Sequence, residues 1–271
     1  MNFTLKRISL ATLTIAATLT IASCATSPTG RSQVLLFPES QLDEMGVQAF
    51  SSMKESIKIS NKPIQNDYVQ CIADSITKYV PKAVFDGEWE VVVFDDPQVN
   101  AFALPGGKIG VYTGLLDVAV NQHQVAAVIG HEVGHVIAHH GNERVSQSTL
   151  IGIGQEAINV ALQTNEVANS QLIMSGLGLS FQYGVIMPFG RTHESEADEI
   201  GLDLMAKAGF NPQESVELWK NMAEASGGNS QPEFFSTHPS SETRIENLQA
   251  KMQVALATYK VAPNRPNCQQ Q

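Results

Sequence analysis

One short pattern constrains the fold of this chain more than any other feature: His131-Glu132-Val133-Gly134-His135. It lies within residues 123–140, where apolar residues recur at helical spacing. Two histidines four positions apart lie one above the other on a helix, so both imidazoles can reach one metal ion. Glu132 lies beside them, where a carboxylate can act as general base toward water. The chain must therefore fold so that a helix presents this face to a metal site, and zinc suits these ligands best.

An acidic cluster at residues 194–198 offers a third ligand. Glu194 and Asp198 are four residues apart and share a helix face, so one can bind the metal while the other orients a ligand imidazole. Glu196 points to the opposite side of the same helix. In a chain without the histidine pattern, such acids would only complement the helix dipole. Together with the two histidines, Glu194 predicts one zinc ion per chain.

The succession of patterns predicts an α+β fold that is mostly helical. Two segments rich in β-branched residues, 89–94 and 108–113, predict strands of a small sheet ahead of the motif helix. Helical periodicity predicts helices at about 64–79, 123–140, 145–163, 192–208, 212–225 and from 240 onward.

Residues 146–187 are open to two interpretations. They are apolar, rich in small residues, and carry Glu156 and Glu166 as their only charges. One interpretation is a flexible lid or a membrane-facing flap. The other is a buried helix, which the glycine and alanine content favours.

Several motifs together resemble the zinc metallopeptidases of family forty-eight, the gluzincins that include CAAX prenyl proteases and HtpX-like heat-shock proteases. The resemblance covers roughly residues 40–250. It is carried by residues 100–107 (Asn-Ala-Phe-Ala-Leu-Pro-Gly-Gly), the 131–135 motif, residues 194–198 with Gly201, and His238-Pro239. It implies a zincin domain with a small β-sheet and an active-site helix. The chain most resembles the secreted bacterial lipoprotein members, which act in outer-membrane protein quality control.

This resemblance gives each motif residue a role. It implies that His131, His135 and Glu194 bind zinc and that Glu132 is the catalytic general base. It implies that Asp198 lies behind the ligands and supports them. The expected partners are protein or peptide substrates.

Four further polar residues stand near these motifs. His238 is a candidate oxyanion donor or a reversible fourth ligand that closes the site, and the alternative is a turn residue before a proline. Arg244 could hydrogen-bond near the site, but we favour a solvated arginine on a helix face. For His139 and His140 we favour a solvent-facing or core-satisfied role, because three zinc ligands are already assigned.

The N-terminus has the layout of a secretory signal. Lys6 and Arg7 precede an uncharged apolar run at residues 8–21, and small residues then lead to Cys24. The run is short for a membrane span, which needs about 20 apolar residues. These features predict a signal peptide at residues 1–23.

Residues 21–24 (Ile-Ala-Ser-Cys) also resemble a bacterial lipobox, with Cys24 as the lipid attachment point. The alternative is an ordinary signal peptide with a cysteine by chance. By resemblance to enterobacterial sorting, Ala25 gives no inner-membrane retention signal, so we expect a periplasm-facing lipoprotein of the outer membrane. We predict a tether at 24–38, the peptidase domain at 39–260 and a C-terminal tail at 261–271.

The charge balance limits the partners. The sequence has 17 Lys+Arg against 27 Asp+Glu, a net charge of −10, and removal of the signal would make the chain more negative by two charges. A protein that binds phosphate backbones should be basic, so the composition argues against nucleic acid. Membrane association should rest on the acyl anchor rather than on attraction to anionic lipid.

Two more cysteines, Cys71 and Cys268, remain after Cys24. In an oxidising compartment they can pair and hold the C-terminal tail, or they can remain free thiols. The sequence does not supply the geometry that decides between these alternatives.

Three functions are compatible with these features. The favoured one is a membrane-anchored zinc endopeptidase that acts on misfolded or unassembled envelope proteins. A periplasmic chaperone or assembly factor could use the same cleft with latent proteolysis. A structural lipoprotein with an accidental motif would bind no metal.

Overall fold

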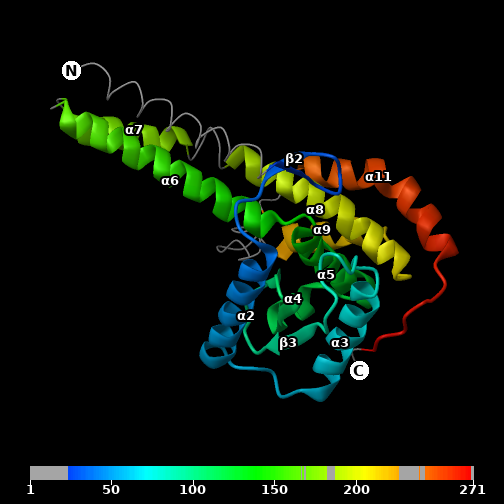
Figure 1. The fold of residues 1–271 in the computed structure, drawn as a ribbon. Coiled ribbons are helices and arrows are strands. Elements are labelled where there is room, and N and C mark those ends of the chain that lie inside the picture. The colour runs from blue at the N-terminus through cyan, green and yellow to red at the C-terminus, as the bar shows by residue number, and fades with distance from the viewer. Residues whose placement is uncertain are drawn as a thin grey trace.

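The computed structural model describes residues 24–165, 167, 169–181, 187–225, 238 and 242–269. Within them the chain is mostly helical with small sheets, which confirms the predicted fold class (Figure 1). The strands are β1 (Cys24–Thr26), β2 (Ser32–Val34), β3 (Glu90–Phe94), β4 (Ala101–Leu104) and β5 (Lys108–Tyr112). The helices are α2 (Glu39–Ser56), α3 (Pro63–Thr77), α4 (Thr113–Val118), α5 (Gln122–Ile137), α6 (His140–Thr164), α7 (Ser170–Phe181), α8 (Met187–Lys207), α9 (Glu214–Ala225) and α11 (Glu242–Val261). The signal peptide predicted for residues 1–23 lies outside the described residues.

Strands β3, β5 and β4 form a sheet in this order, with β3 parallel and β4 antiparallel to β5. Successive side chains point to opposite faces. On one face, Val93 and Val111 join the main core. On the other face, Phe94 and Tyr112 pack with Phe50 of α2. The sheet is thus covered on both faces, while β4 pairs only with β5 among the described strands and keeps one edge without a strand partner.

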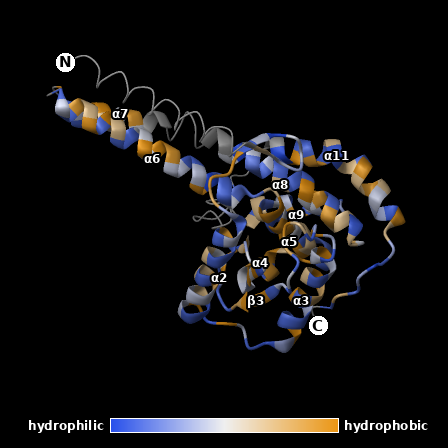
Figure 2. Ribbon diagram, viewed as in Figure 1, coloured by the Kyte–Doolittle hydropathy of each residue, from blue (hydrophilic) through white to orange (hydrophobic). Residues whose placement is uncertain are grey.

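Helix α5 carries the histidine motif and runs through the centre of the fold (Figures 1 and 2). The Asn121 side chain caps it by accepting hydrogen bonds from the backbone N–H groups of His123 and Gln124. Every residue of α5 from Gln124 to Ile137 is buried, with α3, α8, α9 and β4 packed around it. Its polar side chains are therefore held inside the protein.

Small residues allow α5 and α8 to approach closely. A Cβ atom added at Gly130 would lie 2.9 Å from the carbonyl oxygen of Gly201, and one at Gly134 would lie 2.8 Å from that of Ala197. A Cβ at Gly201 would lie 2.7 Å from the backbone nitrogen of His131. Side chains here would force the two helices apart. The close contact brings the acids of α8 next to the histidines of α5.

Helices α6 and α7 correct the expectation for residues 146–187. The favoured interpretation, a buried helix, is wrong for the described part of this segment. Beyond Ser146, α6 runs outward and packs against α7, and together they form a projecting arm (Figure 1). Ile153 and Leu172 on this arm are 63% and 73% exposed. Small residues permitted both interpretations, and the two helices in fact pack mainly on each other. None of the described helices is long and apolar enough to cross a membrane.

The segment expected to be a tether is folded in its first part. β1 and β2 pair as an antiparallel hairpin, which we call the N-terminal hairpin (residues 24–34). Its side chains Ser27 and Gln33 are buried, and β2 packs against α6. The polar composition predicted a flexible linker. The hairpin is ordered instead because Arg31 forms ion pairs with the buried carboxylates of Glu143 and Glu196.

A disulfide joins Cys71 of α3 to Cys268 in the C-terminal tail. Hydrogen bonds also hold this tail. The Gln122 side chain donates to the carbonyl of Pro266 at 3.0 Å and accepts from the backbone N–H of Cys268 at 2.8 Å. The tail therefore packs against the start of α5.

Candidate metal centre

Four side chains converge on one buried point. They are His131 and His135 from α5, Glu194 from α8, and His238, and their ligand atoms all lie within 4.8 Å of one another. The Nε2 atoms of the two α5 histidines are 3.1 Å apart. Glu194 Oε2 lies 3.3 Å from His131 Nε2 and 3.0 Å from His238 Nδ1. The structure thus brings together the three ligands expected from the sequence and adds a fourth.

Hydrogen bonds on the far side of each α5 imidazole fix where its proton lies. His131 Nδ1 is 2.9 Å from Asp198 Oδ1, so this nitrogen donates and, in the neutral imidazole that can bind a metal, Nε2 keeps the lone pair. His135 Nδ1 is 2.8 Å from His140 Nδ1, and the other nitrogen of His140 is 3.1 Å from Glu196 Oε2. His140 therefore donates to the carboxylate and accepts from His135, which again leaves the Nε2 of His135 unprotonated.

This arrangement fits a zinc ion. The two imidazole Nε2 atoms are 3.1 Å apart and lie 3.3 and 3.5 Å from the carboxylate oxygens of Glu194. In a tetrahedral zinc site with bonds of about 2.0–2.1 Å, the ligand atoms lie about 3.3 Å apart. His131, His135, Glu194 and His238 would hold the ion.

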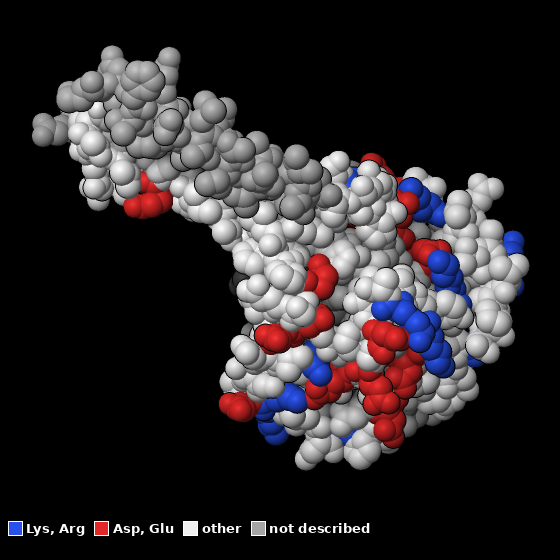
Figure 3. All heavy atoms as spheres, viewed as in Figure 1, with Lys and Arg blue, Asp and Glu red and all other residues white. Residues whose placement is uncertain are grey.

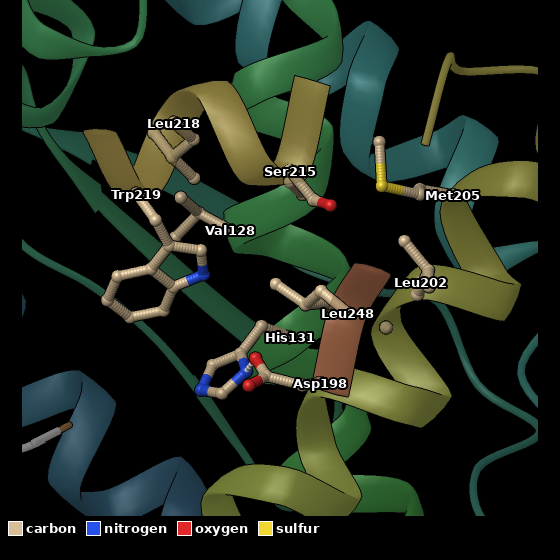
Figure 4. A pocket seen from close by; sticks show the side chains of 11 residues that line it. Val128, His131, Asp198, Leu202, Met205, Ser215, Leu218, Trp219 and Leu248 are labelled. Atoms are coloured by element: carbon tan, nitrogen blue, oxygen red, sulfur yellow. Dashed lines mark ion pairs between the residues drawn. The ribbon is translucent and has the colours of Figure 1, made fainter. Parts of the chain in front are cut away.

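Asp198, which contacts His131, is itself held by a buried ion pair with Arg244. Arg244, expected on a solvated helix face, is only 2% exposed. Its Nε and Nη2 atoms each donate to Asp198 at 2.7 Å, its Nη1 lies 3.1 Å from Glu194 Oε2, and its guanidinium lies 4.0 Å from the ring centroid of Trp219. The expectation was wrong because α11 packs against α8 and buries this face. Figure 4 shows Asp198 beside the His131 ring, with Trp219 nearby.

The electrostatics of the site favour a positive charge between its carboxylates. Burial alone would raise the pKa of Glu194, but hydrogen bonds from His131 and His238 hold this pKa far below its usual range. Burial would also raise the pKa of Asp198, yet Arg244 lowers it. For His131 itself, burial opposes protonation, but the Asp198 and Glu194 carboxylates prevail and raise its pKa to about 9. Both acids are therefore ionised at neutral pH, and a cation is strongly attracted.

His140 is a functional contact that sequence reasoning missed. It is fully buried, as one favoured interpretation had it, but its contact with the ligand His135 was not foreseen. Helical periodicity cannot find this contact, because the chain turns between α5 and α6. The turn lies at His139, whose φ of 53° is left-handed.

Glu132 is the side chain placed to move a proton. It is 4% exposed, and its Oε1 atom has no hydrogen-bond partner in the described part of the chain. His238 Nε2 lies 3.4 Å from this atom. A buried carboxylate oxygen without a donor is costly unless it serves a function.

Two hollows adjoin the site. The one drawn in Figure 4, behind His131, has a volume of about 20 Å³ and has room for about one water molecule, so it is not a substrate cleft. A second, more open groove of about 350 Å³ reaches His135. It is lined by Leu104 and Pro105 at the end of β4 and by Glu39 and Asp43 of α2.

The three cysteines lie apart from this centre. Cys24, the predicted lipid attachment point, is the first residue of β1. Cys71 and Cys268 form the disulfide between α3 and the C-terminal tail.

Comparison with known proteins agrees with this geometry. The sequence profile of a family described as "Peptidase family M48" matches residues 63–252. The mitochondrial metalloendopeptidase OMA1 of Saccharomyces cerevisiae is 36% identical over 62% of this chain and 49% of its own length. The metalloprotease YcaL of Escherichia coli is 34% identical over 59% of this chain and 61% of its own length. The metalloprotease LoiP of the same organism is 28% identical over 81% of this chain and 84% of its own length. The chain spans between a third and a half of the length of the OMA1 proteins that it matches, from 34% to 50%.

Proposed function

The chain belongs to peptidase family M48, and we propose that it is a zinc-dependent endopeptidase. The observation that carries this proposal is the convergence of four ligand atoms with Glu132 beside them. The relatives OMA1, YcaL and LoiP are named as metalloendopeptidases or metalloproteases. A chaperone or a structural lipoprotein would have no use for a buried carboxylate oxygen, Glu132 Oε1, that lacks a hydrogen-bond donor among the described residues.

When bound, zinc would act as a Lewis acid toward the substrate carbonyl and would make the attacking water more acidic. Glu132 acts as general base and then as general acid. Its Oε1 atom lacks a donor among the described residues, so it can accept a proton from the attacking water. The same carboxyl group can then return this proton to the leaving nitrogen. Asp198 and Arg244 keep His131 oriented throughout.

Strand β4 is suited to bind the substrate backbone. It packs against α5 and has an edge that no described strand occupies. An extended peptide can add to such an edge through main-chain hydrogen bonds. The groove beside Leu104 and Pro105 would then receive substrate side chains near His135.

His238 is proposed to be a reversible fourth ligand that closes the site. Its Nδ1 lies 3.0 Å from Glu194 Oε2 and 3.2 Å from His131 Nε2, within the ligand cluster. A hydrolytic zinc site keeps one position open, so His238 must leave before a substrate binds. The substitution His238→Ala should therefore raise the basal kcat/KM for an unfolded protein. A fall in kcat/KM at unchanged zinc content would instead support a role as oxyanion donor.

We further propose that the enzyme works in the bacterial envelope, anchored through a lipid on Cys24 after removal of residues 1–23. The basic, apolar and small-residue layout of this segment supports export. Its substrates are proposed to be misfolded or unassembled envelope proteins, because a β-strand edge recognises extended backbone rather than one folded surface. Mass spectrometry of the protein extracted from membranes would detect the lipid on Cys24. A mature chain that begins elsewhere would contradict the anchor.

The decisive experiment replaces the general base. Glu132→Gln keeps the shape of the side chain, so the variant should retain one zinc ion per chain and lose cleavage of an unfolded model protein. Elemental analysis measures the metal, and gel electrophoresis measures cleavage. Equal cleavage by variant and wild type would refute the mechanism. A wild type that binds zinc, binds unfolded protein and never cleaves it would favour the chaperone alternative.

A further inference from the structure

A second buried polar cluster lies on the side of α8 that faces away from Glu194 and Asp198. At its centre, Arg31 of the N-terminal hairpin bridges two carboxylates. Its Nη1 and Nη2 donate to the two oxygens of Glu143 at 2.6 and 2.7 Å, and its Nε and Nη2 donate to Glu196 Oε2 at 3.1 and 2.9 Å. Glu143 and Glu196 are 1% and 5% exposed. Two such acids need a shared cation to remain ionised so close together.

This cluster continues to a metal ligand. Glu196 Oε2 accepts from His140 Nε2 at 3.1 Å, and His140 Nδ1 lies 2.8 Å from His135 Nδ1. Each contact fixes the proton position of the next. Glu196 accepts the hydrogen bond of His140 Nε2–H, so Nδ1 of the neutral His140 can only accept, and His135 must donate to it. A continuous chain of hydrogen bonds thus runs from Arg31 through Glu196 and His140 to His135.

The two histidine ligands of α5 are supported differently. His131 receives its carboxylate directly, from Asp198 on α8. Among the described residues, His135 Nδ1 contacts His140, and it reaches the Glu196 carboxylate through this second imidazole. The outer contacts of a metal-binding histidine set its orientation and basicity, and their loss weakens metal binding by about 10–100-fold.

The hairpin makes a second contact at the same place. Gln33, which is 2% exposed, donates from Nε2 to the carbonyl of Ala138 at 2.7 Å and to Glu143 Oε2 at 2.9 Å. Ala138 is the C-cap residue of α5, three residues beyond His135. Thr29 also donates to Glu196 Oε1 at 2.6 Å. The hairpin therefore holds both the end of the ligand helix and the carboxylate behind His140.

We propose that Arg31, Glu196 and His140 form a positioning relay for the zinc ligand His135, and that the relay is complete only when the N-terminal hairpin is docked. This inference rests on the proposed zinc site. None of the three residues belongs to the ligand cluster, and they reach the site through His135, so each is a positioning residue. Because the hairpin begins at Cys24, seating of the membrane-proximal end of the chain would be coupled to the affinity of the catalytic site for its metal.

The test is the zinc affinity of the full mature chain, measured by competition with a chromogenic chelator. Arg31→Met should raise the zinc dissociation constant about tenfold. It should also change the visible absorption spectrum of the cobalt-substituted protein, which reports ligand geometry and does not depend on turnover. In the Arg31→Lys variant, the ammonium group can pair with one carboxylate but cannot bridge both, so its zinc affinity should lie between those of Arg31→Met and the wild type.

The matched control is Lys251→Met. Lys251 pairs with Glu199 on the same helix as Glu196, at 2.7 Å, but both side chains are about half exposed. This variant should keep the zinc affinity and the cobalt spectrum of the wild type. Should Arg31→Met fail to fold, Thr29→Val removes one donor to Glu196 at the protein surface and should weaken zinc binding about two- to threefold.

The outcomes separate the two proposals. A wild type that binds no zinc refutes the zinc site itself. A wild type that binds zinc, with Arg31→Met or Thr29→Val matching its affinity and cobalt spectrum, refutes the relay and leaves the zinc site intact. Weaker zinc binding by the Arg31 or Thr29 variants, with Lys251→Met unchanged, supports the relay.

Discussion

Helix α6 joins two regions that differ in nearly every physical respect. Three residues near its start, His140, Glu143 and Ser146, are at most 1% exposed and belong to the polar network behind the metal centre. From residue 147 onward the same helix enters the arm, where Leu150 and Val160 are 47% and 52% exposed. Figure 3 shows acidic and basic groups gathered on the body, while the described part of the arm is largely uncharged.

The difference shows what kind of contact fixes each region. In the centre, the carboxylates of Glu143, Glu196, Glu194 and Asp198 are paired with arginines from other elements, so one substitution leaves an ion without its counter-ion. In the arm, α6 and α7 contact mainly each other among the described elements, and truncating their exposed apolar side chains should remove little packing. Substitutions should therefore have large effects in the centre and small ones in the arm.

The largest effect on stability is expected from Arg244→Met. Methionine retains the apolar contact with Trp219 but leaves the carboxylates of Asp198 and Glu194 without the guanidinium. Breaking a buried ion pair from one side costs about 3–5 kcal/mol. We expect the free energy of unfolding, measured by urea titration, to fall by about this amount.

A double variant checks the cause. Asp198→Asn added to Arg244→Met removes one of the unpaired charges, so it should recover part of the loss. If Arg244→Met lowered the free energy of unfolding by less than about 1 kcal/mol, the claim that substitutions in the centre have large effects would be refuted.

The centre also shows how far the sequence can lead. The spacing of His131 and His135, and that of Glu194 and Asp198, encodes a shared helix face, and the structure indeed brings these four side chains together. This works because residues four apart on a helix have a fixed relation that needs no knowledge of the rest of the fold.

The contacts that sequence reasoning did not find have no such local rule. Arg31 meets Glu196 across 165 positions of the chain, and Arg244 meets Asp198 across 46. A tether at residues 24–38 and a solvated Arg244 were reasonable expectations from the sequence. Which of them becomes buried depends on which elements pack together, and no periodicity records that. The arm was misjudged for the same reason, because a helix of small residues fits a core or a partner helix equally well.

Two isoleucines sharpen the comparison. Ile129 of α5 is 0% exposed in the main core, whereas Ile153 of the arm is 63% exposed. Truncating a fully buried isoleucine removes its packing and leaves a cavity, so Ile129→Ala should lower the free energy of unfolding by about 2–5 kcal/mol. Ile153→Ala should change it by less than about 0.5 kcal/mol.

Both variants are measured by urea unfolding monitored by circular dichroism, with zinc content recorded in parallel. Zinc content should stay at the wild-type level for Ile153→Ala. Comparable losses of stability from the two substitutions would mean that the arm packs against something in solution, and the contrast drawn above would fail.

The smallest effect is expected at the rim of the centre, where His139 Nδ1 lies 3.1 Å from Glu39 Oε2. The hydrogen bond with Glu39 raises the pKa of His139, and the neighbouring Asp43 adds to this rise. The pKa of Glu39 is lowered by the same hydrogen bond. A raised histidine pKa means that the native state holds the proton more tightly than the unfolded chain does. Its contribution to stability is therefore complete below about pH 6.5 and is lost as the pH rises through the native pKa.

His139→Asn tests this contribution, because asparagine tolerates the left-handed φ of 53° and does not titrate. The side chains of His139 and Glu39 are 25% and 47% exposed, so solvent screens the pair and its worth should be about 0.5 kcal/mol. The wild type should lose about this much more stability than the variant between pH 6 and pH 8, in urea unfolding of the zinc-saturated proteins. An identical pH dependence of the two proteins would show that the pair contributes nothing. A difference of several kcal/mol would mean that this rim pair contributes as much to stability as the buried ion pairs of the centre do.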